Sequence, residues 1–223
     1  MTFMDKTLKE NIPIWDKCAE TTFIRELREG ILPAEKFRRY MIQDSIYLKH
    51  YARVCGMAVC LSTDPGDIQI WHSLLRQVTE EESLVRLSYL KKYGLTDEDA
   101  GKMKPLPENQ RYIDFLTDIA GQRDTEEILM AVLPCMLSYS YIFRKAAKRR
   151  ETPASKYFDF IQDYAEDGYF WECRDLCDFA EGKCRGLPEA KRKKLGGIFR
   201  QASLLELEFW EMAYGNSVRK KEE

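Results

Sequence analysis

Apolar residues recur at helical spacing along most of the chain, and no stretch alternates apolar and polar residues as a β-strand would. The most apolar stretch is residues 125–150. Thr125 is the predicted N-cap, acidic residues follow it, and basic residues end the stretch, which suits a helix dipole. Apolar side chains cover every face between these ends, so we predict a buried central helix. We consider it too short, and too charged at its flanks, for a membrane span.

Glycine and proline divide the rest of the chain into further predicted helices. These cover residues 5–20, 23–28, 33–61, 67–93, 112–121, 154–165, 169–180 and 188–214. Residues 95–110 contain two prolines and little periodicity, so we expect a loop or lid there. The pattern predicts one all-α helical bundle over residues 1–223, in which residues 216–223 form a frayed tail.

Composition removes several classes of function. The net charge of −2 leaves no electrostatic footprint for nucleic acid or for an anionic membrane surface. The seven cysteines are an odd number, and the N-terminus lacks the apolar core of a secretory signal, so we expect a cytoplasmic protein with reduced thiols. With two histidines and no CxxC pair, we expect neither a metal site nor another cofactor.

Two carboxylates interrupt apolar helical stripes. Asp44 lies in the series 37, 41, 44, 48, 51 and 55, and Glu206 in the series 195, 199, 202, 206, 209 and 213. Because a buried charge is costly without a partner, each acid either pairs with a buried Arg or Lys, or contributes to a polar pocket inside the bundle. Tyr112 and Tyr164 also face inward from apolar stripes, as core tyrosines or as part of that pocket.

The central stretch places Cys135 directly after Pro134, and Tyr139 follows one turn later on the same face. A proline inside a helix removes one backbone hydrogen bond and displaces the carbonyl four residues earlier, here Met130. Cys135 is therefore either an inert core thiol beside a kink or a nucleophile that needs a nearby base. A buried glutamate with a raised pKa can act as that base. The other acid, surrounded by aromatic rings, suits a flat, amino-substituted heterocycle.

Three motifs carry a resemblance to a known family. QDSIYLKHYARV at residues 43–54, LPCMLSY at 133–139 and ELEFWEMAY at 206–214 resemble the TenA family of thiaminase II proteins, in the same order and spacing. The resemblance implies the all-α fold shared with haem oxygenases and assembly as a homotetramer. It also implies hydrolysis of the C–N bond between an aminomethyl pyrimidine and its leaving group, in salvage of degraded thiamin.

The resemblance also implies roles for individual residues. Cys135 would add to the pyrimidine ring, Glu206 would be the general acid/base, and Asp44 would hydrogen-bond the amino group and ring edge. Four tyrosines would line the substrate: Tyr47, Tyr112, Tyr139 and Tyr164. Residues 136–138 lack the aromatic residues often found after the cysteine. Thiamin, the aminomethyl pyrimidine and its formyl derivative all stay open as the substrate.

Other functions of a related fold fit less well. A haem protein needs an axial histidine near the N-terminus, and the first 49 residues contain none. A di-iron oxidase needs ExxH ligands, and neither histidine has a glutamate three residues before it. The remaining alternative is a non-catalytic pyrimidine-binding or regulatory protein. For such a protein the basic residues 191–194 are either an anionic docking site or a solvated helix face.

Overall fold

The computed structural model of the chain describes residues 1–81 and 83–216, without the side chains of residues 80–85. Every regular element in this part of the chain is a helix, which confirms the predicted all-α class. The α-helices are α1 (Phe3–Ala19), α2 (Thr22–Arg28), α3 (Ala34–Leu61), α4 (Pro65–Arg76), α5 (Ser83–Lys92), α6 (Asp97–Gly101), α7 (Pro107–Gly121), α8 (Thr125–Ala147), α9 (Phe158–Ala165), α10 (Asp167–Cys184) and α11 (Glu189–Tyr214). A π-helical segment, η1 (Gln77–Glu81), follows α4, and a 3-10 turn, η2 (Thr152–Ala154), precedes α9.

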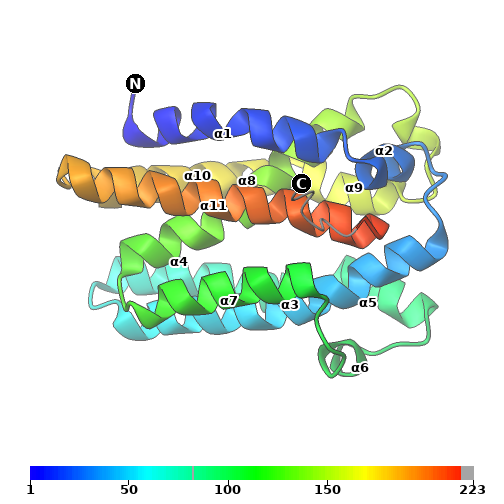
Figure 1. The fold of residues 1–223 in the computed structure, drawn as a ribbon, viewed down its shortest axis with the longest axis horizontal. Coiled ribbons are helices and arrows are strands. Elements are labelled where there is room, and N and C mark those ends of the chain that lie inside the picture. The colour runs from blue at the N-terminus through cyan, green and yellow to red at the C-terminus, as the bar shows by residue number, and fades with distance from the viewer. Residues whose placement is uncertain (82, 217–223) are drawn as a thin grey trace, which may run out of the picture.

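The long helices run side by side, with α1 along one edge of the molecule and α3 and α7 along the opposite edge (Figure 1). Between these edges, α8 packs against α1, α3, α7, α9, α10 and α11. Residues 127–134 and 136–140 of α8 are all buried, as the apolar pattern predicts for a central helix. By length and composition alone α8 could cross a membrane, contrary to our expectation, but 89% of its most apolar window is buried inside the protein.

The start of α8 differs by one residue from the prediction. Asp124, not Thr125, is the N-cap, and its carboxylate accepts a hydrogen bond from the Glu127 amide at 3.0 Å. Both residue types cap helices well, so the pattern alone does not choose between them.

The basic residues 191–194 prove to be more than a docking site or a solvated face. Lys191 forms ion pairs with Asp124 and with Glu127, the latter at 2.7 Å, and Lys194 reaches Glu127 at 2.6 Å. Glu127 is only 2% exposed, so these contacts bury much of the charge. Two of the four bases therefore hold the start of α11 against the start of α8.

Two predicted elements between α3 and α7 are wrong. The expected helix over residues 67–93 is divided into α4, η1 and α5. Within η1, the Thr79 hydroxyl donates to the Leu75 carbonyl at 2.9 Å, a contact with which threonine competes with the helical backbone. The expected loop over residues 95–110 contains α6, whose start is closed by a capping box between Thr96 and Asp99, and the first residues of α7.

Smaller differences lie at the helix ends. The helix expected from residue 154 begins at Phe158, after η2, and the one expected over residues 169–180 is longer at both ends. Of the predicted frayed tail, residues 217–223 lie outside the described part of the chain.

Candidate functional site

The seven residues predicted for the site come from five helices. Asp44 and Tyr47 lie on α3, Tyr112 on α7, Cys135 and Tyr139 on α8, Tyr164 on α9 and Glu206 on α11. Six of them are buried. Cys135 is partly exposed, although every other residue from 127 to 140 is buried. Cys135 is therefore the one residue of this buried stretch of α8 that is partly accessible.

Glu206 and Tyr112 form the polar contact on the α11 side of the site. The Tyr112 hydroxyl donates to Glu206 Oε1 at 2.8 Å, and both side chains are almost fully buried. Burial raises the pKa of Tyr112 well above its ordinary value, and the negative charges of Glu206 and Cys135 raise it further. Tyr112 therefore stays a neutral hydrogen-bond donor at any physiological pH.

Three tyrosines show that Cys135 and Glu206 converge on one site. Burial raises the pKa values of Tyr47 and Tyr139 as well, and in both cases the charges of Cys135 and Glu206 contribute to the rise. The ring of Tyr47 lies 4.7 Å from that of Tyr112, centre to centre. A thiol and a carboxyl group thus lie near the same cluster of phenols.

Asp44 lies near this cluster and is 6% exposed. Burial raises the pKa of Asp44 to about 7, and Glu206 and Asp97 add to the rise, while the Arg86 guanidinium lowers it. The pKa of Tyr139 also responds to the charge of Asp44. Asp44 therefore has features of both predicted arrangements, the buried ion pair and the polar pocket. The buried cation Arg86 acts on it, and it belongs to the same site as Glu206.

Aromatic side chains form the wall behind the site. The hydroxyls of Tyr40 and Tyr139 are hydrogen-bonded at 2.9 Å, and the Tyr40 ring is parallel to Trp210, with centres 5.3 Å apart. Tyr164 joins the group through Tyr139, which it meets edge-on at 5.1 Å. Tyr40 and Trp210 were absent from the predicted site. Tyr40 stands one turn before Asp44 on α3, and that spacing was the available signal.

Side chains also contact the backbone of α8 around Cys135. The hydroxyls of Tyr51 and Tyr169 donate to the carbonyls of Val132 and Met136, at 3.3 Å and 3.4 Å. The helix stays α-helical through Pro134, despite the hydrogen bond that proline cannot donate. Neighbouring helices therefore hold the turn that carries the thiol.

The segment predicted as a lid is fastened beside Asp44. The Gln43 side-chain carbonyl accepts hydrogen bonds from the Leu106 amide and the Asn109 side chain, both at 2.9 Å. Asn109 also donates to the Gln43 backbone carbonyl at 2.8 Å. Because Gln43 precedes Asp44 directly, these contacts fix the start of α7 against the part of α3 that carries the acid.

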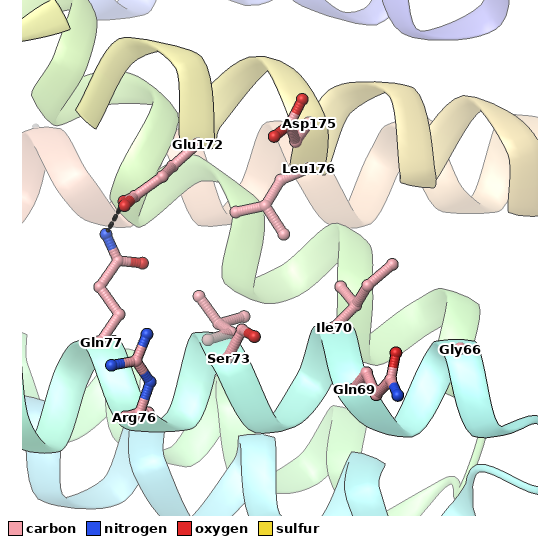
Figure 2. A pocket seen from close by; sticks show the side chains of 10 residues that line it. Gly66, Gln69, Ile70, Ser73, Arg76, Gln77, Glu172, Asp175 and Leu176 are labelled. Atoms are coloured by element: carbon pink, nitrogen blue, oxygen red, sulfur yellow. Dashed lines mark hydrogen bonds between the residues drawn. The ribbon is translucent and has the colours of Figure 1, made fainter. Parts of the chain in front are cut away.

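Surface hollows approach the site from the side of α9. A groove of about 590 Å³ runs between α4 and α10, and Gln77 Nε2 donates to Glu172 Oε2 across it at 2.5 Å (Figure 2). A second hollow of about 250 Å³ shares Gln77 and Glu172 and is also lined by Tyr164. Neither hollow is lined by Asp44, Cys135 or Glu206. Tyr164 therefore connects the buried cluster with the surface.

Among the described residues, no three His, Cys, Asp or Glu side chains gather in a metal-binding arrangement. The acids of the site instead have a phenol and a guanidinium as neighbours.

Known proteins resemble the chain over nearly its whole length. The model of the TENA/THI-4/PQQC family matches residues 8–216. Over 219 residues the chain is 29% identical to the "Aminopyrimidine aminohydrolase" of Halalkalibacterium halodurans, covering 96% of each protein. A TenA homologue from P. horikoshii OT3 superposes with a TM-score of 0.86 at 28% identity, over 97% of this chain and 100% of that one. A Shewanella denitrificans domain with a haem oxygenase-like fold gives a TM-score of 0.73 at 16% identity, over 95% and 91%. These neighbours confirm the expected fold type.

Proposed function

Because the chain belongs to the TENA/THI-4/PQQC family, we propose that it is a hydrolase of thiamin metabolism, which cleaves the C–N bond between an aminomethyl pyrimidine and its leaving group. One observation carries the proposal. A partly exposed thiol, Cys135, and a buried carboxyl group, Glu206, act on the same three tyrosines, beside a second buried acid, Asp44. This set matches the chemistry of adding a nucleophile to a flat, amino-substituted ring.

In the proposed reaction, Glu206 takes the proton of the Cys135 thiol, and the sulfur bonds to a ring carbon of the pyrimidine. Addition of the sulfur breaks the aromaticity of the ring, and Glu206 passes the proton to a ring nitrogen. The electron pairs of the exocyclic amino group and ring nitrogen then expel the leaving nitrogen from the methylene carbon. Water adds its hydroxyl to that carbon; its proton goes to the departing amino group of the aminomethyl pyrimidine, or to solvent when the leaving group is the thiazole of thiamin. The ring nitrogen returns its proton through Glu206, and the thiol departs.

Asp44 supplies recognition in this scheme, because a carboxylate accepts hydrogen bonds from an amino group and from a protonated ring nitrogen. Tyr47, Tyr112, Tyr139 and Tyr164 supply an aromatic enclosure for the ring. Thiamin, the aminomethyl pyrimidine and its formyl derivative share this ring, and the nature of the leaving group decides among them. The homotetramer and the cytoplasmic location stay predictions from the family resemblance, and light scattering of the purified protein tests the former.

The direct test is product mass and ammonia release with each of the three pyrimidines. We expect hydroxymethyl pyrimidine from the wild-type protein, and almost complete loss of turnover in Cys135→Ala, because no other group can form the bond to the ring. Cys60→Ala is the matched control, since Cys60 is an exposed thiol on α3, outside the site. Near wild-type turnover by Cys135→Ala would refute the mechanism.

A binding protein without activity would give a different result. It would hold hydroxymethyl pyrimidine, and yet the wild-type protein would release no product from any of the three compounds. Alkylation in the Cys60→Ser background gives a second measure. The pyrimidine should protect Cys135, while Cys18 and Cys55 are fully buried and should not react.

A further inference from the structure

A hollow of about 470 Å³ lies between α1, α8 and α10, and none of the seven residues predicted for the site lines it. The three helices pack against each other, and α1 runs alongside α10 (Figure 1). Apolar side chains from all three helices line the hollow: Leu8, Ile12, Trp15, Leu137 and Phe170. Sites for small molecules are mostly apolar hollows of about 300–1,000 Å³, so this size and lining suit one.

The charged side chains that line this hollow are all basic. They are Arg144, Lys145, Lys148 and Arg174, and no described Asp or Glu lies among the lining residues. Lys148 and Arg174 are exposed, and neither forms an ion pair with any residue that the structure describes. An apolar surface edged by cations alone is complementary to an anion with an apolar body.

The other two bases have acidic partners outside the hollow. Arg144 donates to Asp167 at 2.9 Å, and Lys145 donates to Asp16 at 2.7 Å. The side chains of the two acids are 84% and 44% exposed. Ion pairs with such exposed acids are weak, so they leave much of the positive charge available to a ligand.

Ser140 is a buried polar group that lines the same hollow. It is 5% exposed, and its hydroxyl makes no hydrogen bond to any described residue. A buried serine within a helix can donate to the carbonyl four residues earlier, as Ser45 does at 2.9 Å. For Ser140 that carbonyl belongs to Met136, which instead accepts from the Tyr169 hydroxyl at 3.4 Å and the Cys173 thiol at 3.7 Å. The Ser140 hydroxyl is therefore available to a molecule in the hollow.

We propose that this hollow binds a small organic anion with an apolar body, such as a carboxylate on a short alkyl chain. The apolar side chains of the three helices cover the body, and the Ser140 hydroxyl donates to the anionic head. Ser140, Arg144 and Lys148 are spaced by four residues, which places them on one face of α8. Arg174 adds a cation from α10. The site is separate from the proposed hydrolysis, so the inference does not rest on the proposed function.

Calorimetric titration with octanoate tests the proposal, with octanol as the uncharged probe of the same length. We expect saturable binding of octanoate that weakens as salt is added, because salt screens exposed charges. Octanol should bind at least about tenfold more weakly, since one hydrogen bond to a charged group has about that effect. Equal binding of the two probes, or no binding of octanoate, would overturn the inference.

Variants place the bound probe in the hollow. Lys148→Gln/Arg174→Gln replaces two exposed bases and should weaken octanoate binding at least about tenfold. The matched control is Lys193→Gln/Arg200→Gln, which makes the same change of charge at exposed positions of α11 outside the hollow. Ser140→Ala should weaken binding by about 2- to 10-fold. Octanoate bound equally by all these variants would show that it lies elsewhere, and the inference would be wrong.

Two larger partners present the same chemistry and give different results. If a second copy of the chain covers the hollow, the wild-type protein binds no octanoate, and Lys148→Gln/Arg174→Gln sediments as a smaller assembly. If an anionic membrane is the partner, vesicles of phosphatidylglycerol carry the wild-type protein to the pellet and the double variant stays in solution. Either result would overturn the assignment of a small-molecule site.

Discussion

The two buried acids of the site lie on different helices, and their surroundings differ in kind. Glu206 lies on the long, uninterrupted helix α11, and its described partner is the neutral phenol of Tyr112. Asp44 instead experiences the positive charge of Arg86, which lies on α5, after the π-helical segment η1. A cation resists protonation of its acid more strongly than a phenol does. The two acids therefore ionise in different electrostatic surroundings: a neutral hydrogen-bond donor beside Glu206, and at Asp44 a cation opposed by burial and by two other acids.

Of the two acids, Glu206 should give the larger effect on turnover. Glu206→Gln keeps the shape of the side chain and an oxygen that can accept the Tyr112 hydrogen bond, but it cannot take up a proton. General acid–base catalysis supplies about 100- to 10,000-fold in rate, so kcat for ammonia release should fall by about that factor. The matched control is Glu208→Gln, which replaces an acid of the same helix that pairs with Arg111 at 2.6 Å. A Glu206→Gln protein as active as this control would remove the proton-transfer role.

The raised pKa of Asp44 should make the stability of the protein depend on pH. The pKa of Asp44 is about 7 in the folded protein and near its ordinary value of 3.8 when unfolded. Between these values the folded state binds the extra proton, so the free energy of unfolding should decrease as pH rises from about 4 to about 7. Three pKa units correspond to about 4 kcal/mol.

Urea denaturation of the wild-type protein and Asp44→Asn at pH 5 and pH 8 measures this contribution. The variant should lack the decrease and should be the more stable protein, relative to wild type, at the higher pH. Asp118→Asn, at an exposed position of α7, serves as the control and should keep the wild-type dependence. If the free energy of unfolding depends on pH equally in wild type and Asp44→Asn, Asp44 ionises with its ordinary pKa. Asp44 and Glu206 would then not differ in the way described above.

Tyr112→Phe should have a smaller effect, confined to the Glu206 side. The change removes the hydroxyl that donates to Glu206, and a hydrogen bond to a charged group contributes about 1.5–3 kcal/mol. We expect kcat/KM to fall at least about tenfold. The part of its pH profile that depends on the ionisation of Asp44 should stay at the same pH. Tyr157→Phe is matched in chemistry, because its buried hydroxyl donates to the Leu32 carbonyl at 2.8 Å, outside the site. Both variants should lose stability, and only Tyr112→Phe should lose activity.

The same contrast separates what the sequence could predict from what it could not. Asp44 and Glu206 were identifiable because α3 and α11 are long and regular, so a charge within an apolar series had to face inward. The partner of Asp44 was not identifiable. Arg86 lies beyond η1, and Asp97, with which it forms an ion pair, lies on α6 in the segment expected to be a loop. Tertiary contacts of this kind leave no periodic pattern in the sequence from which they could be predicted.

Pro134 offers the finest test, because it belongs to the regular part of the fold and yet breaks its backbone pattern. Pro134→Ala restores a backbone donor in a buried helix, where proline costs about 3 kcal/mol, although it also removes buried ring atoms. These effects oppose each other, so the free energy of unfolding should change little. Turnover should still fall several-fold, because a small misplacement of a reacting group slows a reaction markedly and Cys135 is the next residue.

Leu137→Ala, which truncates a buried side chain three residues away from Pro134, should show the reverse: lower stability with turnover retained at a temperature where it is folded. Wild-type turnover by a well-folded Pro134→Ala protein would show that α8 presents the thiol without help from proline, through contacts such as those of Tyr51 and Tyr169.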